Sequence, residues 1–547
     1  MSYTAHIDTF ARDNLPPRDR WPELRFTLPE LQYPARLNCV THFLDRWIEE
    51  GRGDAPCLIG PAETLTYAQL QEQVNRIANV LVGTLGLVPG GRVLLRSANN
   101  PTWVAVFLAV LKAGGVVVAT MPLLRAREIA YPLNKAKVTL ALCDSRLAAE
   151  LEKARPLAPD LKRVVYWGDG PPDGLEALMV DVSPEFEAVD TAAEDVCLIA
   201  FTSGTTGEPK GTMHFHRDLL ATCDSYGRHV LRASPDDRFI GSPPLAFTFG
   251  LGGLALFPMH VGAATVLLER ATPDELLPAI AKHRASVCFT APTAYRAMLA
   301  KLGEHDVSSL RKCVSAGEAL PKATFEAWHE ATGLKLMDGI GATEMLHIFI
   351  AAREDEIRPG ATGKPVPGYE AKVIGEDGRD LPPGSVGRLA VRGPTGCRYL
   401  ADERQRKYVQ DGWNVTGDTY RRDEDGYFWY QARSDDMIIS AGYNIAGPEV
   451  EAALLSHPAV AECGVVGAPC PERGMIVKAY VVLAAGERPG PEMAKALQDH
   501  VKQEIAPYKY PRAIEFVSEL PKTQTGKLQR FALRQMAQAA SSAPAAA

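Results

Sequence analysis

Short apolar runs alternate with amphipathic segments along two stretches of this chain, and this alternation restricts the fold more than any other feature. In the first stretch, residues 92–96 and 116–120 are predicted strands, and residues 102–113 between them are a predicted helix that Asn100 caps. The second stretch repeats the pattern, with strands predicted at 264–268, 286–290, 312–315 and 334–337 and helices at 273–283, 292–302 and 321–331. Strands joined through helices lie parallel, so we expect an α/β fold with mainly parallel sheets flanked by helices.

The pattern changes twice towards the C-terminus. From about residue 360 to residue 434, short strand-like runs such as 387–392 and 427–430 alternate with Pro, Gly and Asp turns, which predicts a β-rich subdomain. A compact α+β pattern then follows, with helices predicted at 448–456 and 492–505 and strands at 460–466, 477–483 and 513–517. A chain of 547 residues exceeds what one hydrophobic core serves. We therefore predict an N-terminal domain over residues 1–434, a small C-terminal lid domain over 435–535 and a flexible tail over 536–547.

Composition and charge argue against several classes of protein. The formal net charge is −7 and the pI is near 6.0, so no general attraction to nucleic acid or to an anionic membrane is expected. The ten cysteines form no C-x-x-C pair and the N-terminus lacks the pattern of a secretory signal, which indicates reduced thiols and a cytoplasmic location. The apolar stretch 103–121 is interrupted by Lys-Ala-Gly-Gly, so no transmembrane helix is predicted. His214 and His216 stand only two residues apart, and we interpret both as structural rather than as metal ligands.

A run dense in hydroxyls and glycines follows the apolar residues 196–201. Residues 202–211 read Thr-Ser-Gly-Thr-Thr-Gly-Glu-Pro-Lys-Gly. After a buried strand, such a loop exposes backbone N–H groups that can bind a polyphosphate. It is not a Walker A loop, because Lys210 follows Pro209. A surface turn is the alternative, but ten residues of this kind in one order favour nucleotide binding. The candidate phosphate-binding residues are Thr202, Ser203, Gly204, Thr205, Thr206, Gly207 and Lys210.

This loop resembles the signature of the adenylate-forming superfamily, which includes acyl- and aryl-CoA ligases, firefly luciferases and the adenylation domains of peptide synthetases. Four further segments resemble motifs of that family in the family's order: 338–344 (Asp-Gly-Ile-Gly-Ala-Thr-Glu), 416–418 (Thr-Gly-Asp), 430–436 (Tyr-Gln-Ala-Arg-Ser-Asp-Asp) and 521–527 (Pro-Lys-Thr-Gln-Thr-Gly-Lys). The resemblance implies that a carboxylate attacks the α-phosphorus of ATP and expels pyrophosphate to form an acyl-adenylate. The thiol of coenzyme A then takes the acyl group, and AMP leaves. Such a reaction needs positioning and cations rather than a protein nucleophile.

The resemblance also implies roles for individual residues. Thr343 would contact the α-phosphate, and Glu344 would help to bind Mg²⁺. Lys527 would bridge the substrate carboxylate and an α-phosphate oxygen, offsetting charge as the two anions approach. The remaining candidate nucleotide-binding residues are Gly317, Glu318, Asp338, Gly339, Asp418, which would hold the ribose hydroxyls, and Arg433.

A rotation of the lid would let one site catalyse both half-reactions. By resemblance, Asp435 is the hinge, and after rotation the segment with Gly442 and Tyr443 would form the tunnel for coenzyme A. Acetylation of Lys527 by a lysine acetyltransferase would remove its charge and stop adenylation. We expect a monomer or a homodimer.

The candidate acid pocket favours an aromatic substrate. Its predicted lining comprises Tyr226, Phe247, Thr248, Gly339, Ile340 and His347. Amino-acid-activating relatives usually carry a carboxylate in the Phe-rich segment, and its absence from Phe247-Thr248-Phe249 disfavours an α-amino acid. Residues 338–349 resemble benzoate- and 2-aminobenzoate-CoA ligases, and residues 8–17 resemble the 2-aminobenzoate group. A neutral arylamine needs a hydrogen-bond acceptor, which His347 or Thr248 could supply.

The sequence therefore predicts an ATP-dependent aryl-acid CoA ligase, with 2-aminobenzoate as the expected substrate. Benzoate, another aryl acid or a medium-chain acid is the alternative within the same reaction. A luciferase-type oxygenase shares the nucleotide motifs and is the alternative from another class. A peptide-synthetase module, a kinase or ATP hydrolase, and a binding protein without activity are each disfavoured, the last because both Glu344 and Lys527 are present.

Overall fold

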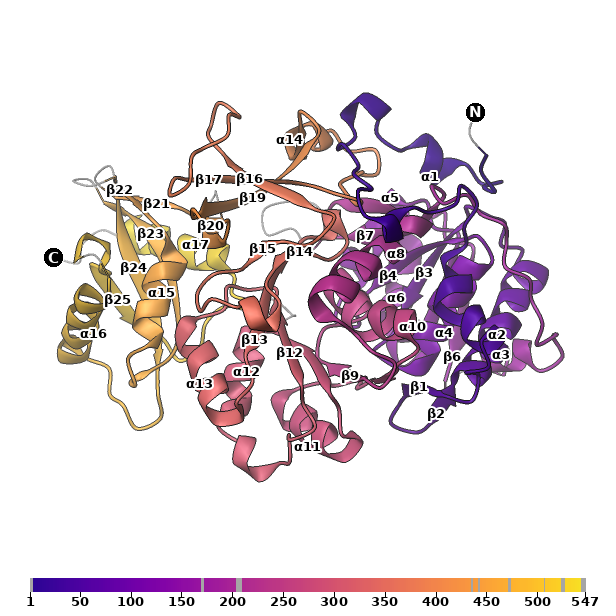
Figure 1. The fold of residues 1–547 in the computed structure, drawn as a ribbon, viewed down its shortest axis with the longest axis horizontal. Coiled ribbons are helices and arrows are strands. Elements are labelled where there is room, and N and C mark those ends of the chain that lie inside the picture. The colour runs from indigo at the N-terminus through magenta and orange to yellow at the C-terminus, as the bar shows by residue number, and fades with distance from the viewer. Residues whose placement is uncertain are drawn as a thin grey trace.

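The computed structural model describes residues 3–168, 172–202, 209–433, 436–440, 443–470, 474–505, 507–522 and 527–542. The chain forms two large sheets, a β-rich subdomain and a small C-terminal domain, and the last of these is the yellow end of Figure 1. This arrangement confirms the predicted α/β fold class. In the described part of the chain, no helix has the length and apolarity that crossing a membrane requires.

The first sheet has the strand order β6-β5-β3-β4-β7-β8 and is parallel except for β8. Its strands are β3 (Arg92–Arg96), β4 (Val116–Thr120), β5 (Leu140–Asp144), β6 (Arg163–Trp167), β7 (Val196–Phe201) and β8 (Gly211–Phe215). The predicted β-α-β unit is present, because β3 pairs with β4 in parallel through α4 (Pro101–Lys112). The Asn100 side chain accepts a hydrogen bond from the Trp103 backbone N–H at 2.9 Å, which caps α4 as predicted.

The helix α4 lies in the centre of the largest hydrophobic core. Every residue of α4 except Thr102 is buried, so its apolar side chains pack on all sides. The charged end of Lys112 is buried as well, and its Nζ donates to Asp45 Oδ1 at 2.7 Å and to Asn75 Oδ1 at 2.8 Å. These two partners compensate for the loss of water around the ammonium group.

The second sheet has nine strands in the order β15-β14-β13-β12-β11-β9-β10-β1-β2. The strands from β1 to β13 along this order are parallel, and β2, β14 and β15 are antiparallel to their neighbours. Their bounds are β1 (Pro56–Ile59), β2 (Thr64–Thr66), β9 (Arg238–Gly241), β10 (Ala264–Val266), β11 (Val287–Thr290), β12 (Lys312–Ala316), β13 (Leu336–Gly341), β14 (Ile348–Ala351) and β15 (Lys364–Pro365). The predicted strand 334–337 is too short, because β13 continues to Gly341 between β12 and β14.

Helices cover both large sheets. Beside α4, they are α1 (Phe10–Asp13), α2 (Arg46–Glu49), α3 (Tyr67–Asn79), α5 (Ala126–Lys135), α6 (Ala148–Ala154), α7 (Leu175–Met179), α8 (His216–Thr222), α9 (Thr248–Leu251), α10 (Phe257–Val261), α11 (Pro273–His283), α12 (Pro292–Leu299) and α13 (Lys322–Thr332). In the described ranges, π-helical segments interrupt or extend them at η3 (Thr41–Asp45), η4 (Val80–Thr84), η7 (Cys223–Leu231) and η8 (Gly252–Leu256). Residues 216–231 are therefore not one uniform α-helix, because α8 ends at Thr222 and η7 begins at Cys223.

The β-rich subdomain is an antiparallel sheet of five strands, β16 (Glu370–Ile374), β17 (Val386–Arg392), β18 (Val409–Gln410), β19 (Trp413–Arg422) and β20 (Phe428–Arg433), with the short helix α14 (Gln405–Tyr408). It lies across the top of the molecule in Figure 1, next to both the first sheet and the C-terminal domain.

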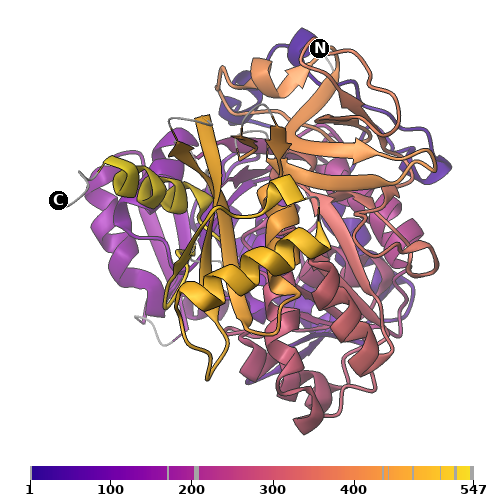
Figure 2. The ribbon, with the colours of Figure 1, turned by 90° about the vertical axis from the view of Figure 1, so that its left-hand side faces the viewer.

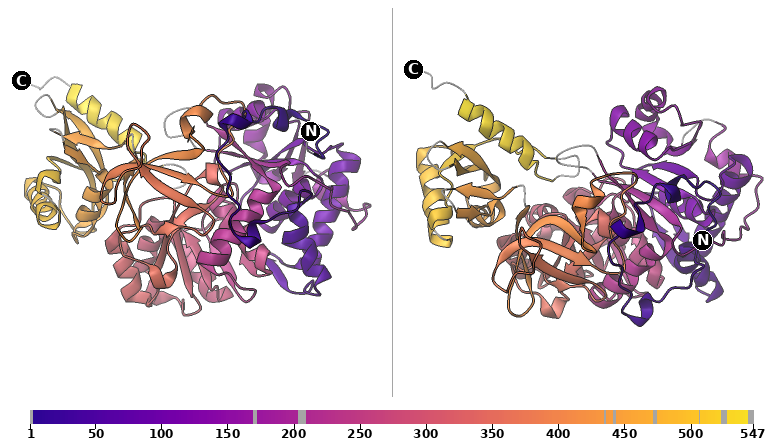
Figure 3. Two further views of the ribbon diagram at one scale, coloured as in Figure 1. Left: turned by 45° about the horizontal axis from the view of Figure 1, so that its top comes forward. Right: turned by 90° about the horizontal axis from the view of Figure 1, so that it is seen from above.

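The C-terminal domain forms one end of the molecule, as Figures 2 and 3 show. Its sheet contains β21 (Ile438–Ser440), β22 (Tyr443–Ile445), β23 (Val460–Cys470), β24 (Gly474–Leu483) and β25 (Ala513–Phe516), and its helices are α15 (Gly447–Leu455), α16 (Pro491–Glu504) and α17 (Arg530–Ser542). Successive strand residues face opposite sides, so Val465 packs in the core with α15 and α16 while Val466 packs with α17. The helix α17 continues to Ser542, so residues 536–542 of the predicted tail are helical.

Candidate active site

The carboxyl ends of β12 and β13 place four predicted nucleotide-binding residues side by side. In the parallel register, Ser315 is opposite Asp338 and Ala316 is opposite Gly339. Gly317 follows directly, with a φ of +92° that few other residues adopt, and Glu318 is next. Because crevices at the carboxyl edges of parallel strands are where α/β proteins bind ligands, Gly317, Glu318, Asp338 and Gly339 fit a nucleotide site.

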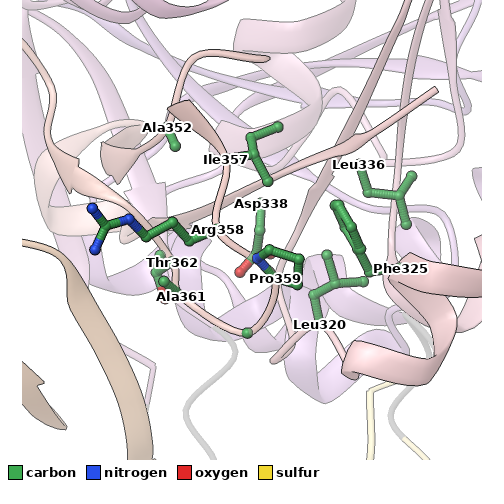
Figure 4. Close-up of a pocket in the computed structure, with 11 residues that line it drawn as sticks. Leu320, Phe325, Leu336, Asp338, Ala352, Ile357, Arg358, Pro359, Ala361 and Thr362 are labelled. Carbon is green, nitrogen blue, oxygen red and sulfur yellow. The ribbon is translucent and has the colours of Figure 1, made fainter. Parts of the chain in front are cut away.

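The carboxyl group of Asp338 lies in a small pocket, shown in Figure 4. Apolar side chains such as Phe325 and Ile357 form part of its lining, together with the loop that follows Ile357. Burial raises the pKa of Asp338 to about 7. Among the described residues no group forms a hydrogen bond with Asp338 Oδ1. The site therefore holds a polar atom that an amino group of a bound base could satisfy.

Asp418 and Arg433 are neighbours on two adjacent strands of the β-rich subdomain. They are directly opposite in the antiparallel register of β19 and β20, and Arg433 Nη1 donates to Asp418 Oδ1 at 3.3 Å. Gly417 allows this approach, because a Cβ atom there would lie 3.2 Å from Arg433 Nη2. Burial raises the pKa of Asp418, and the Arg433 guanidinium opposes that shift.

Glu344 lies in the 3₁₀ turn η10 (Thr343–Met345), and its side chain is buried. The Tyr399 hydroxyl donates to Glu344 Oε1, and Lys210 Nζ lies 3.6 Å from the same oxygen. The Lys210 ammonium also stands 5.0 Å from the centre of the Tyr399 ring. The structure thus brings Lys210 and Glu344 together from motifs far apart in the sequence. A carboxylate here fits the oxygen ligands that Mg²⁺ prefers.

Lys527 places the C-terminal domain at the same site. A Cβ atom at Gly317 would lie 3.4 Å from Lys527 Cε and 3.7 Å from Lys527 Nζ. Loss of surrounding water lowers the pKa of Lys527, the Glu318 carboxylate opposes this shift, and Arg433 adds to it. Lys527 therefore lies close to groups that follow β12 and to Arg433 at the end of β20. Its place at the reacting end of the nucleotide stays a prediction.

The phosphate loop is described only at its two ends. The Thr202 backbone N–H donates to the Lys210 carbonyl at 3.0 Å, and the Lys210 backbone N–H donates to Thr202 Oγ1 at 3.3 Å, so the base of the loop is closed. The predicted sites Ser203, Gly204, Thr205, Thr206, Gly207, Asp435 and Gly442 lie outside the described residues. Tyr443 begins β22.

An aromatic cluster surrounds His347 in the predicted acid pocket. The imidazole lies 4.6 Å from the Phe257 ring, 5.5 Å from the Tyr226 ring and 5.8 Å from the Phe249 ring, between ring centres. Burial lowers the pKa of His347 to about 3, so the imidazole is neutral. Gly252 allows the ring to sit here, because a Cβ atom on Gly252 would lie 2.3 Å from His347 Cδ2.

The other predicted pocket residues are placed around this cluster less directly. Phe247 and Thr248 open α9 and are half-buried, while the next residue, Phe249, packs its ring near His347. Ile340 is half-buried on β13, and Gly339 packs against the Ile348 side chain.

Sequence reasoning missed several residues that complete the site. Phe257 and Phe289 stand outside every motif, although both belong to the aromatic cluster. Tyr399 also lies outside the motifs, yet it holds Glu344. His214 was interpreted as structural, and its Nε2 bonds to the Thr343 carbonyl at 2.8 Å. The spacing of residues along the chain does not indicate such contacts, because each contact joins residues of different elements that are far apart in the sequence.

The fold and this convergence of groups define an enzyme that forms adenylates. Residues 44–399 match the family model described as AMP-binding enzyme, and residues 449–527 match the AMP-binding enzyme C-terminal domain. The chain belongs to this family, and it is an AMP-forming acid–CoA ligase that uses ATP and coenzyme A.

Three relatives illustrate the similarity. A benzoate–CoA ligase of Thauera aromatica is 38% identical over 93% of this chain and 98% of the relative. The crystal structure of the anthranilate CoA ligase AuaEII in complex with anthranoyl-AMP matches with a TM-score of 0.90 and 37% identity, covering 94% of this chain and all of the other. A benzoate CoA ligase structure from Burkholderia xenovorans LB400 matches with a TM-score of 0.83 and 33% identity, covering 91% and 99%.

Proposed function

We propose that this chain activates an aromatic acid, and that 2-aminobenzoate is its substrate. The observation that carries the proposal is the hydrogen bonding of His347. Its Nε2 lies 3.4 Å from the Phe249 carbonyl oxygen, which can only accept, so the proton belongs on Nε2. The other nitrogen, Nδ1, is then a lone-pair acceptor, and it has no partner among the described residues.

An ortho-amino group matches this acceptor. The amine of 2-aminobenzoate is neutral at pH 7 and donates N–H groups, so it can satisfy His347 Nδ1 without a buried carboxylate. The ring would pack among Tyr226, Phe249 and Phe257. The likeness to an anthranilate CoA ligase structure, at 37% identity and a TM-score of 0.90, supports this choice.

Benzoate is the second candidate, and a specific observation favours it: a benzoate–CoA ligase is 38% identical over 517 residues. Benzoate would fit the same aromatic cluster but would leave His347 Nδ1 without a partner, which costs about 1–3 kcal/mol for a buried polar atom. The two candidates therefore differ in one hydrogen bond.

The residues of the site suit both half-reactions. Lys527 would hold the acid carboxylate against the α-phosphate, Thr343 would bind that phosphate, and Asp418 with Arg433 would fix the ribose. Bound at Glu344, Mg²⁺ would offset negative charge on the ATP phosphates. Rotation about Asp435 would then remove Lys527 and bring Gly442 and Tyr443 to the thiol of coenzyme A. The hinge, the acetylation of Lys527 and the oligomeric state stay predictions.

A substrate panel with a His347 variant tests the choice of acid. Pyrophosphate release is measured with 2-aminobenzoate, benzoate, fluorobenzoates, phenylacetate and medium-chain fatty acids. His347→Leu should lower kcat/KM for 2-aminobenzoate by about 10-fold and change that for benzoate much less, as expected for one hydrogen bond.

The matched control is Phe257→Leu, which alters the same cluster but keeps the Nδ1 atom of His347. It should change kcat/KM for both acids by a similar factor. Equal losses for both acids in His347→Leu would contradict the role of Nδ1. Activity with fatty acids alone would contradict the aromatic pocket.

A further inference from the structure

Three consecutive residues of the turn Thr343–Met345 are each held by a buried side chain from elsewhere in the chain. His214 Nε2 bonds to the Thr343 carbonyl oxygen at 2.8 Å. The Tyr399 hydroxyl donates to the Glu344 carboxylate, and Thr395 Oγ1 donates to the Met345 carbonyl oxygen at 2.8 Å. His214, Thr395 and Tyr399 are at most 1% exposed, so water does not compete for these bonds.

The three holding side chains come from one edge of the first sheet. His214 lies on β8, and the segment with Thr395 and Tyr399 runs along the free side of β8. The Met213 backbone N–H donates to the Arg398 carbonyl at 2.8 Å, and Leu400 N–H donates to the Gly211 carbonyl at 2.8 Å. The strand β8, which follows the phosphate loop, therefore carries one of the three contacts, and it pairs with the segment that carries the other two.

A buried ion pair packs next to this edge of the first sheet. Arg398 and Asp218 are both fully buried and joined by a hydrogen bond, and Asp218 Oδ2 lies 3.7 Å from His214 Nδ1. Asp218 also accepts from the Phe215 backbone N–H at 3.0 Å at the start of α8. The Tyr369 hydroxyl lies 2.8 Å from Thr395 Oγ1. Thr395 is thus oriented by a second hydroxyl, and the His214 ring lies beside the Asp218 carboxylate.

The backbone directly after the turn is strained. Leu346 has a φ of +70°, a region that costs a residue with a side chain about 1–2 kcal/mol. Such a conformation persists where the surroundings enforce it. The hydrogen bonds from His214, Tyr399 and Thr395 supply that enforcement on the three residues that precede Leu346.

We propose that Tyr399, together with His214 and Thr395, is a positioning residue for the adenylation half-reaction. Its hydroxyl fixes the rotamer of the Glu344 carboxylate, and His214 fixes the backbone that carries Thr343. The proposal rests on the roles proposed above for Thr343 and Glu344. The effect is on the alignment of those two groups with MgATP, before any substrate acid reacts.

The test uses Tyr399→Phe in the full-length enzyme, because this variant keeps the ring near Lys210 and removes only the hydroxyl. We expect kcat/KM for MgATP in adenylate formation to fall by about 10- to 100-fold, as for a misaligned carboxylate. Thioester formation from preformed aryl-adenylate should change by less than about 3-fold. In equilibrium binding without acid, the gain in ATP affinity that Mg²⁺ provides should shrink.

The matched control is Tyr408→Phe. The Tyr408 ring packs edge-on against the Tyr399 ring, 5.7 Å between centres, and its buried hydroxyl has no partner among the described residues. Removing this hydroxyl should leave adenylation and the Mg²⁺ effect unchanged. A second pair of variants serves if Tyr399→Phe does not fold: His214→Gln, which keeps a donor for the Thr343 carbonyl, should retain more adenylation activity than His214→Leu.

Glu344→Gln separates the failure of this inference from that of the proposed roles. If Glu344→Gln adenylates as the wild type does, the role of Glu344 is wrong. If Glu344→Gln is inactive but Tyr399→Phe behaves as Tyr408→Phe does, the positioning role is overturned and the proposed function stands. Equal adenylation by His214→Gln and His214→Leu would overturn the role of His214 in the same way.

Discussion

At the residue scale, the candidate site contains two buried polar atoms that lack a hydrogen-bond partner among the described residues. Asp338 Oδ1 and His347 Nδ1 form no hydrogen bond among the described residues. Burying such atoms costs free energy, and native proteins keep few of them. Their placement at the carboxyl edge of β13 and within the aromatic cluster fits a site whose ligand completes the hydrogen bonding.

The raised pKa of Asp338 makes stability depend on pH. Its folded value of about 7 lies above its ordinary value of 3.8, so the folded chain holds the proton more tightly than the unfolded chain. The stabilisation from this group is complete below about pH 4 and is lost as the pH rises through about 7. The Asp338→Asn variant removes this dependence. Its unfolding free energy relative to the wild type should therefore rise by a few kcal/mol between about pH 4 and pH 8.

Denaturant titrations of the ligand-free enzyme at several pH values measure this difference. Asp377→Asn, at an exposed turn where the carboxyl side chain is 61% exposed, serves as the control and should run parallel to the wild type. If the unfolding free energies of Asp338→Asn and the wild type change with pH in parallel, the raised pKa of Asp338 is contradicted.

At the element scale, strand edges and π-helices position the chemistry. Parallel strands β12 and β13 bring candidate nucleotide-binding residues together, and β19 and β20 place Asp418 opposite Arg433. The π-helices η7 and η8 carry Tyr226 and Gly252 to the aromatic cluster. Such bulges in helices are frequent at functional sites.

Gly252 is a position at which a single methyl group should disturb the acid pocket. A Cβ atom there would lie 2.3 Å from His347 Cδ2, so Gly252→Ala must displace the imidazole. We expect a loss of about 1–3 kcal/mol of stability from overpacking and a lower kcat/KM for the aromatic acid. The control is Gly83→Ala in the π-helix η4, where a Cβ atom meets nothing within 4 Å.

Thermal melting and pyrophosphate release check both variants. Gly83→Ala should melt near the wild type with unchanged activity. If Gly252→Ala behaves in the same way, the packing of His347 on η8 does not shape the pocket.

The alternation of strands and helices was predictable from sequence because its signals are local. Hydrophobic period, the Asn100 cap and the turn residues lie within a few positions of the elements that they define. The strand β13 was predicted too short, since Asp338-Gly339-Ile340-Gly341 has weak strand propensity and gains its conformation from pairing with β12 and β14. The switch to a π-helix at Cys223 likewise depends on packing rather than on local spacing.

At the scale of the whole molecule, two domains form one site. Lys527 from the C-terminal domain lies beside Gly317 of the large domain, and Arg296 Nη2 donates to the Val460 carbonyl at 2.8 Å between them. The motifs name candidate residues for this site, but their spacing carries no information on how the domains are oriented. The contacts that Tyr399, Thr395 and His214 make with the turn Thr343–Met345 could not be predicted from the sequence either, because they depend on how distant segments pack together.

The proposed role of Lys527 would separate the two half-reactions. Lys527 lies beside Gly317 in this orientation of the C-terminal domain, and the proposed rotation would withdraw it. Under this proposal its charge would serve adenylate formation and not thioester formation.

A comparison of these two half-reactions in Lys527→Ala is the most direct test of the proposed role of Lys527. Adenylate formation from the acid and ATP should fall by about 100-fold or more, while thioester formation from preformed aryl-adenylate and coenzyme A should stay near the wild-type rate. An equal loss in both half-reactions, or no loss in the first, would contradict the assignment of Lys527 to the adenylation step.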